Sequence, residues 1–69
     1  MNTAKYSEGD ILLSRGFSGE KKKIIYVFYE NGYANYLIQP VHNKFPPLSI
    51  EETNLDKNYL LLSSEYRKA

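Results

Sequence analysis

The dipeptide Asn31-Gly32 restricts the fold of this chain more than any other feature, because it separates two runs of β-branched and aromatic residues. Asn and Gly readily take the two positive φ angles of a type I′ turn, which joins adjacent antiparallel strands through two residues. Residues 22–29, before the turn, are rich in Ile, Val, Tyr and Phe, which lose rotamer freedom in a helix and suit a pleated sheet. The sequence therefore predicts a β-hairpin.

The two-residue turn also predicts the hairpin register and the face on which each side chain lies. It places Glu30 opposite Tyr33 and, further along, Ile25 opposite Ile38. The predicted core face is apolar or aromatic throughout and carries Ile25, Val27, Tyr29, Ala34, Tyr36 and Ile38. The opposite face is mixed and carries Ile24, Tyr26, Phe28, Glu30, Tyr33, Asn35, Leu37 and Gln39.

Turn-forming residues divide the rest of the chain into further short strands. We expect a strand at 10–15, followed by a loop at Gly16-Phe17-Ser18-Gly19. Pro40 lacks the N–H that a sheet ladder needs and closes the strand after the turn, and residues 41–44 then form a connection. The chain predicts one domain over residues 1–69, with its core at 6–64 and a frayed tail at 65–69.

The last third of the chain predicts a short strand, a brief helical turn and a final strand. Pro46-Pro47 favour extended backbone before a strand at 48–50. Ser49 and Glu52 match a capping box, in which Ser49 caps a helix and Glu52 returns to its backbone N–H. Weak helix formers follow, so we expect one turn, of 3₁₀ type, at 51–56. A strand at 59–63 ends the fold.

Composition excludes several classes of small protein. The chain has 69 residues, no Cys and no Trp, and its 9 basic and 8 acidic residues give a net charge of +1. Without Cys there is no disulfide framework and no thiolate nucleophile, which favours a reducing compartment, and the longest apolar run is too short to cross a bilayer. We expect a cytoplasmic protein without a membrane segment. Residues with AT-rich codons dominate, which is typical of a low-GC bacterium or of a phage or mobile element within one.

The order of these elements resembles that of the SH3-like small β-barrels. The resemblance covers Gly9-Asp10 before the first strand, Asn31-Gly32, Leu55 and the strand at 59–62. It implies an all-β, five-stranded barrel with one short 3₁₀ or α turn before the last strand. Signalling SH3 domains bind proline-rich peptides with a tryptophan and an acidic loop, whereas this chain has no Trp and a basic first loop. The resemblance therefore implies a fold and no ligand.

Catalytic groups are scarce in this sequence. His42 is the only imidazole and lies in a predicted loop, where a solvated side chain is the simpler interpretation. The adjacent Glu51 and Glu52 diverge on a helical turn and form no dyad. No glycine-rich phosphate motif and no set of metal ligands at usable spacing is present. We expect no enzyme activity, no metal site and no cofactor.

The basic residues Arg15, Lys21, Lys22 and Lys23 form the only concentration of charge. A solvated strand end that discourages edge aggregation explains them. The alternative is a nucleic-acid-binding barrel, because Tyr26 and Phe28 nearby would add stacking surfaces to the cations.

The aromatic residues of the mixed face provide the leading functional hypothesis. Large apolar patches are rarely left bare on soluble monomers, so these side chains are either buried within a strongly bent barrel or covered by a partner. The second interpretation predicts a small protein-interaction or regulatory module, encoded by a phage or mobile element, that binds a host protein. An accessory subunit and a homodimer are further alternatives. The predicted partner-binding residues are Tyr26, Phe28, Tyr33 and Leu37.

Overall fold

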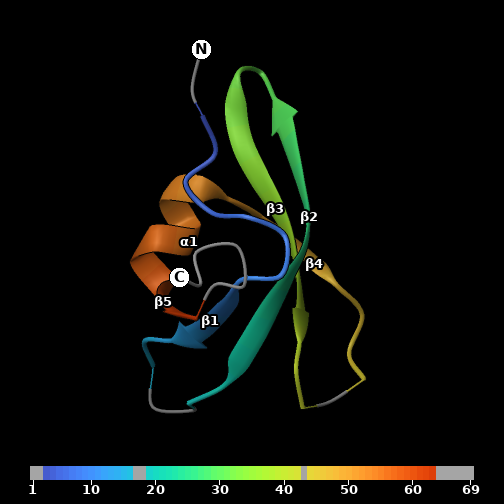
Figure 1. The fold of residues 1–69 in the computed structure, drawn as a ribbon, viewed down its shortest axis with the longest axis vertical. Coiled ribbons are helices and arrows are strands. Elements are labelled where there is room, and N and C mark those ends of the chain that lie inside the picture. The colour runs from blue at the N-terminus through green and yellow to red at the C-terminus, as the bar shows by residue number, and fades with distance from the viewer. Residues whose placement is uncertain (1–2, 17–18, 43, 64–69) are drawn as a thin grey trace.

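The computed structural model describes residues 3–16, 19–42 and 44–63. Its elements are β1 (Ile11–Ser14), β2 (Lys21–Glu30), β3 (Tyr33–Pro40), β4 (Leu48–Glu51), α1 (Glu52–Asn58) and β5 (Tyr59–Ser63), shown in Figure 1. The strand predicted at 59–63 has the predicted bounds, and Pro40 ends β3 as expected. Phe17 and Ser18 of the predicted loop, Asn43 of the predicted connection and the predicted tail at 65–69 lie outside the described residues.

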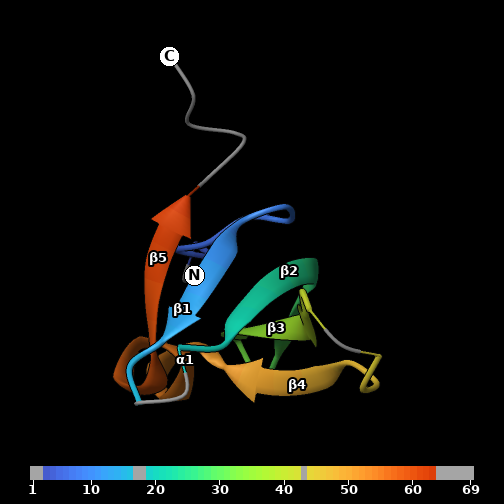
Figure 2. The same cartoon turned by 90° about the horizontal axis from the view of Figure 1, so that it is seen from below.

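The five strands form one antiparallel sheet in the order β4-β3-β2-β1-β5. Figure 2 shows the sheet curling from β5 and β1 through β2 to β3 and β4, with α1 beside the start of β5. The curl stays open between the edge strands β4 and β5. The mostly β architecture with one short helix is therefore confirmed, and its form is an open half-barrel.

The predicted hairpin turn is present between β2 and β3. Asn31 has a φ of 54° and Gly32 a φ of 81°, the two positive angles that a type I′ turn requires. The predicted register is confirmed from Glu30 opposite Tyr33 to Tyr26 opposite Leu37.

Beyond that point the predicted register is wrong, because β2 contains a β-bulge between Ile24 and Tyr26. Ile38 pairs with Ile24 instead of Ile25, and Ile24 is fully buried. Ile24 is also bonded to the segment before β1, since its N–H donates to the Asp10 carbonyl (2.9 Å) and its carbonyl accepts from Gly9 (2.8 Å). A bulge bends a strand and changes the face of the residues beyond it, so Ile24 joins the core and Ile25 is only half-buried.

The core lies on the concave side of the sheet. Of the predicted core face, Ala34, Tyr36 and Ile38 are buried and Val27 packs against them, which confirms that part of the prediction. Tyr29 is 53% exposed and not a core residue, although its partner Ala34 is buried, because its hydroxyl reaches the exposed margin of the cluster and accepts there from the Ala4 N–H at 3.0 Å. The remaining buried apolar side chains of the described residues come from the segment before β1 and from β1, β2 and α1: Tyr6, Leu12, Ile24 and Leu55.

The helix differs from its prediction. α1 is an α-helix of 7 residues and not a single 3₁₀ turn, and Glu51 is its N-cap without a side-chain capping bond. Ser49 lies within β4, so the predicted capping box is wrong. Leu55, fully buried in the core, supplies the tertiary contact that the weak helix formers around it lack.

Leu55→Ala tests whether this one side chain anchors α1. The substitution should lower the free energy of unfolding by about 2–5 kcal/mol, because it removes a fully buried side chain and leaves a cavity. Chemical denaturation followed by circular dichroism measures the change. Leu62→Ala, at a site 50% exposed, is the control and should cost well under half as much; equal losses would contradict this role for Leu55.

Candidate functional site

The side of the β2–β3 hairpin that faces away from the core forms one continuous surface, which we call the outer face. The alternation of side chains along each strand, together with the bulge in β2, determines which residues lie on this face. It consists of Lys21, Lys23, Tyr26, Phe28 and Glu30 from β2 and Tyr33, Asn35, Leu37 and Gln39 from β3.

Aromatic side chains occupy the centre of the outer face. Tyr26 and Phe28 stand two residues apart on β2, with ring centroids 6.0 Å apart and planes at 20°. Tyr26 is 55% and Tyr33 58% exposed, whereas Phe28 and Leu37 are half-buried. The four side chains predicted to bind a partner therefore share one face, and the barrel does not bury it.

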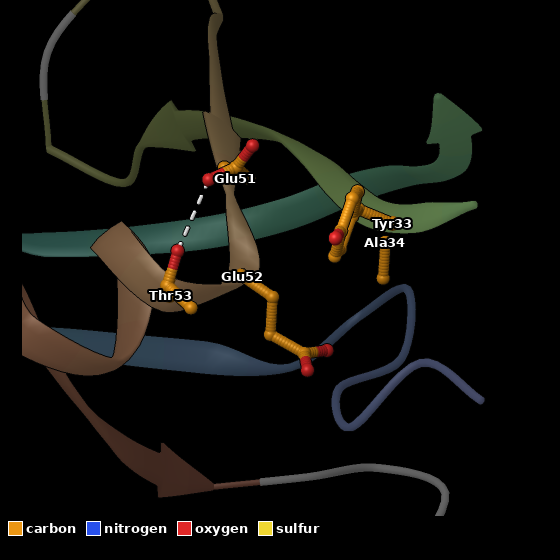
Figure 3. A pocket seen from close by; sticks show the side chains of 5 residues that line it. All are labelled: Tyr33, Ala34, Glu51, Glu52 and Thr53. Atoms are coloured by element: carbon orange, nitrogen blue, oxygen red, sulfur yellow. Dashed lines mark hydrogen bonds between the residues drawn. The ribbon is translucent and has the colours of Figure 1, made fainter. Parts of the chain in front are cut away.

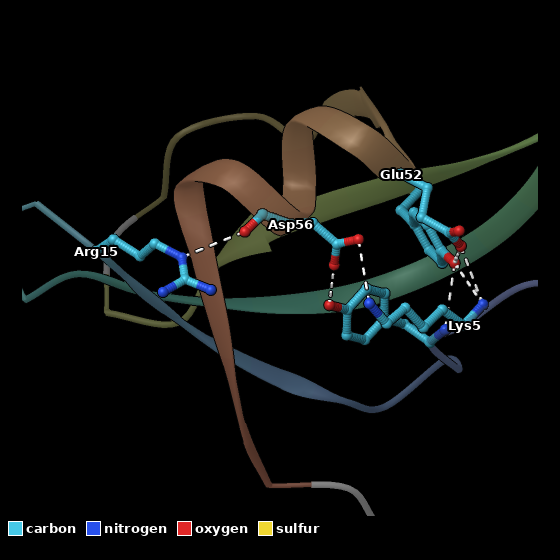
Figure 4. A network of polar contacts seen from close by, with 6 residues as sticks. Lys5, Arg15, Glu52 and Asp56 are labelled. Carbon is cyan, nitrogen blue, oxygen red and sulfur yellow. Dashed lines mark hydrogen bonds and ion pairs between the residues drawn. The ribbon is translucent and has the colours of Figure 1, made fainter.

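The four basic residues predicted as a nucleic-acid site do not form one patch. Lys22 lies on the core side beside Leu12, its side chain is 12% exposed, and its Nζ is 3.5 Å from Oε2 of Glu20. Arg15 turns toward the helix and donates from Nε to the Asp56 carbonyl at 3.2 Å (Figure 4). Only Lys21 and Lys23 accompany the aromatic side chains.

The opposite end of the outer face is acidic. Glu30 ends β2, and Glu51 of β4 pairs with Asn35 of β3. A pocket of about 490 Å³ lies here, lined by Tyr33, Ala34, Glu51, Glu52 and Thr53 (Figure 3). The Thr53 hydroxyl donates to Oε1 of Glu51 at 3.1 Å. The outer face thus has an aromatic centre between a lysine end and a glutamate end.

On the concave side, a polar network ties residues 3–10 to α1. The Tyr36 hydroxyl accepts from the backbone N–H groups of Lys5 (3.1 Å) and Tyr6 (3.2 Å) and donates to Oε1 of Glu52 (2.5 Å). The Tyr6 hydroxyl donates to Asp56, whose carboxylate also pairs with Nζ of Lys5 at 3.2 Å. Figure 4 shows this arrangement along the helix.

These tyrosines hold their protons firmly. Burial, followed by the hydrogen bond to Asp56, raises the pKa of Tyr6 to about 12 from its usual 10.0. Burial, followed by the bond to Glu52, raises the pKa of Tyr36 well above its usual range. The hydrogen bond from Tyr6 and then the bond from Lys5 lower the pKa of Asp56. Both phenols therefore stay protonated near neutral pH and keep donating to their carboxylates, so the network acts as a structural clamp.

Sequence reasoning missed this clamp. Its partners are separated by 16 to 51 residues, so no local pattern connects them. The sequence places Asp10 at the start of a strand, whereas its side chain is fully buried in a turn, where Oδ2 accepts from the Ser7 N–H at 3.0 Å. Gly9 precedes it with a φ of 95°, which explains the Gly9-Asp10 pair.

His42 and the acidic side chains supply the remaining metal-ligand types within residues 3–16, 19–42 and 44–63. His42 is exposed, and no three His, Asp or Glu side chains among the described residues gather closely enough to hold a metal ion. Within those ranges no helix is long and apolar enough to span a bilayer.

Comparisons with protein-family models, curated proteins and solved structures found no match to this chain. The surface of the chain itself is then the basis for a functional proposal, and on the outer face Tyr26 and Tyr33 are both more than half exposed.

Tyr6→Phe tests the clamp through its pH dependence. The raised pKa of Tyr6 means that its hydroxyl stabilises the fold fully below pH 10.0, and that this contribution is lost as the pH rises through about 12. Tyr6→Phe should lower the free energy of unfolding by about 1 kcal/mol at pH 7. Denaturant titrations at increasing pH should show the stability difference from wild type falling as the pH rises above 10.0. Tyr26→Phe, on the outer face, is the control and should change little; a pH-independent difference for Tyr6→Phe would refute the clamp.

Proposed function

We propose that this protein is a small protein-interaction module and that the outer face is its binding surface. The observation that carries the proposal is a row of aromatic and apolar side chains on the outer face, in which Tyr26 and Tyr33 are exposed and Phe28 and Leu37 are half-buried. Tyr and Phe anchor protein interfaces well, because they bury much area while few rotatable bonds become ordered. Binding, and not catalysis, is the activity we propose for this face.

The charges around this centre favour a protein over a nucleic acid. Interfaces between proteins have an apolar core and a polar rim that carries both signs of charge. Lys21 and Lys23 lie at one end of the outer face and Glu30 and Glu51 at the other. A phosphate backbone would meet attraction at only one end, and Lys22 and Arg15 are engaged elsewhere.

We also propose that the half-barrel is related in shape to the SH3-like barrels. A three-stranded meander, a short helix and a last strand that returns beside β1 support this relation. Small sheets of this kind can bind a partner on their loops or on an exposed face. Binding therefore requires no deep cleft, which a chain of 69 residues has little room to form.

Tyr26→Ala tests the proposed surface. With the purified protein as bait, it should weaken capture of a protein partner at least about tenfold, because truncating an aromatic hot-spot residue at the centre of an interface costs about 2 kcal/mol or more. Copies of the chain count as partners in this measurement. Tyr29→Ala is the matched control, since Tyr29 is 53% exposed but lies on the other side of β2, and it should bind as wild type does.

Two outcomes would contradict the proposal. One is that no stoichiometric protein complex forms, or that Tyr26→Ala and Tyr29→Ala affect it equally while both variants stay folded. The other is salt-dependent binding of single-stranded oligonucleotides that needs Tyr26 and Lys23, without any protein complex.

A further inference from the structure

We infer that the protein bound by the outer face is a second copy of this chain, placed face to face across a two-fold axis at the Tyr26–Leu37 pair. The inference rests on the proposed function and names its partner. It is carried by a symmetry in the positions of the charged and apolar side chains along the hairpin.

Distances along the hairpin can be counted in pairing positions from the Tyr26–Leu37 pair. Glu30, paired with Tyr33, is four positions away toward the turn. In the other direction Ile25 is the bulged residue and has no pairing position, so Lys21 is also four positions away. Lys21 lies beside Val41, because the Val41 N–H donates to the Lys21 carbonyl at 3.0 Å. The lysine end and the glutamate end are therefore equidistant from the centre.

A two-fold axis in the interface and perpendicular to β2 reverses the hairpin of the second copy. Each β2 then lies over the β2 of the other copy in the opposite direction, which sets Lys21 over Glu30 of the second copy, twice by symmetry. Among the described residues, neither Lys21 nor Glu30 has an ion-pair partner within its own chain.

The other outer positions match under the same operation. Two positions from the centre, Asn35 meets Gln39 and Phe28 meets Lys23, whose ammonium can lie over the aromatic ring. Four positions away, Tyr33 at the start of β3 meets Val41, the residue after β3, and these side chains are 58% and 43% exposed. Tyr26 and Leu37 meet their own copies at the axis.

Charge selects this orientation from the two that a face-to-face dimer allows. An axis parallel to β2 would place the lysine ends over each other and the glutamate ends over each other, and such like-charge contacts oppose binding. The sheet curls away on both sides, so contact concentrates on the hairpin that carries this pattern (Figure 2). Sheets packed face to face lie about 10 Å apart, within reach of Tyr and Lys side chains.

Charge reversal tests the dimer decisively. Analytical ultracentrifugation of the full chain, from about 1 µM to about 1 mM, should show a concentration-dependent dimer. Lys21→Glu and Glu30→Lys should each weaken it at least about tenfold, because each reversal creates two like-charge contacts. An equimolar mixture of the two variants should dimerise as wild type does, since every contact in the mixed dimer is again between opposite charges. Lys57→Glu, on exposed Lys57 of α1, is the control and should leave the dimer unchanged.

The outcomes separate this inference from the proposed function. A wild-type chain that stays monomeric over that range, or reversals that the mixture does not rescue although both variants are folded by circular dichroism, would overturn the dimer. If such a monomer still captures a different protein through Tyr26, the proposed function survives. If it captures none, both fail.

Discussion

The bulge in β2 is the constraint on which both sides of the sheet depend. Without the bulge, regular alternation along β2 would bury Ile25 and would place Ile24 and Lys22 on the outer face. With it, Ile24 is fully buried and bonded to Gly9 and Asp10, and Lys21 and Lys23 share a face with Tyr26. One extra residue in one strand therefore determines both the composition of the core and the charge of the outer face.

The concave side depends on polar contacts as well as on apolar packing. Few side chains of the described residues are fully buried, as expected because a short chain can enclose only a thin core. The Tyr36 ring contributes to that core, while its hydroxyl joins two backbone N–H groups of the first residues to Glu52 of α1. The Tyr6 ring also packs in the core, edge-on to Tyr36 at 5.6 Å, and its hydroxyl donates to Asp56 of α1. On this side of the sheet, tyrosines whose rings pack in the core and whose hydroxyls bond to α1 hold the helix in place.

The parts of the fold that could be predicted from sequence are those that local chemistry determines. Asn31-Gly32 determines its turn and five pairs of the register, and Pro40 ends its strand. The shared face of Tyr26, Phe28, Tyr33 and Leu37 followed from that register. The bulge could not be predicted, because Ile24 and Ile25 are alike and only the backbone bonds to residues 9 and 10 favour burial of Ile24. The helix start was mispredicted because the Glu52 carboxylate bonds to Tyr36 and Lys5, distant in sequence, and not to a local cap.

The same bulge gives the outer face its symmetry. Lys21 is five residues before Tyr26 and Glu30 four residues after it, so in a regular strand the two charges would lie at unequal distances and on opposite faces. Because Ile25 is left out of the pairing, Lys21 and Glu30 are equally far from Tyr26 and lie on the same face. The unpaired residue Ile25 therefore has two effects: Ile24 is buried, and the charges of the outer face are complementary to those of a second copy related by a two-fold axis. Core packing and the partner proposed for the outer face are consequently linked through one backbone irregularity.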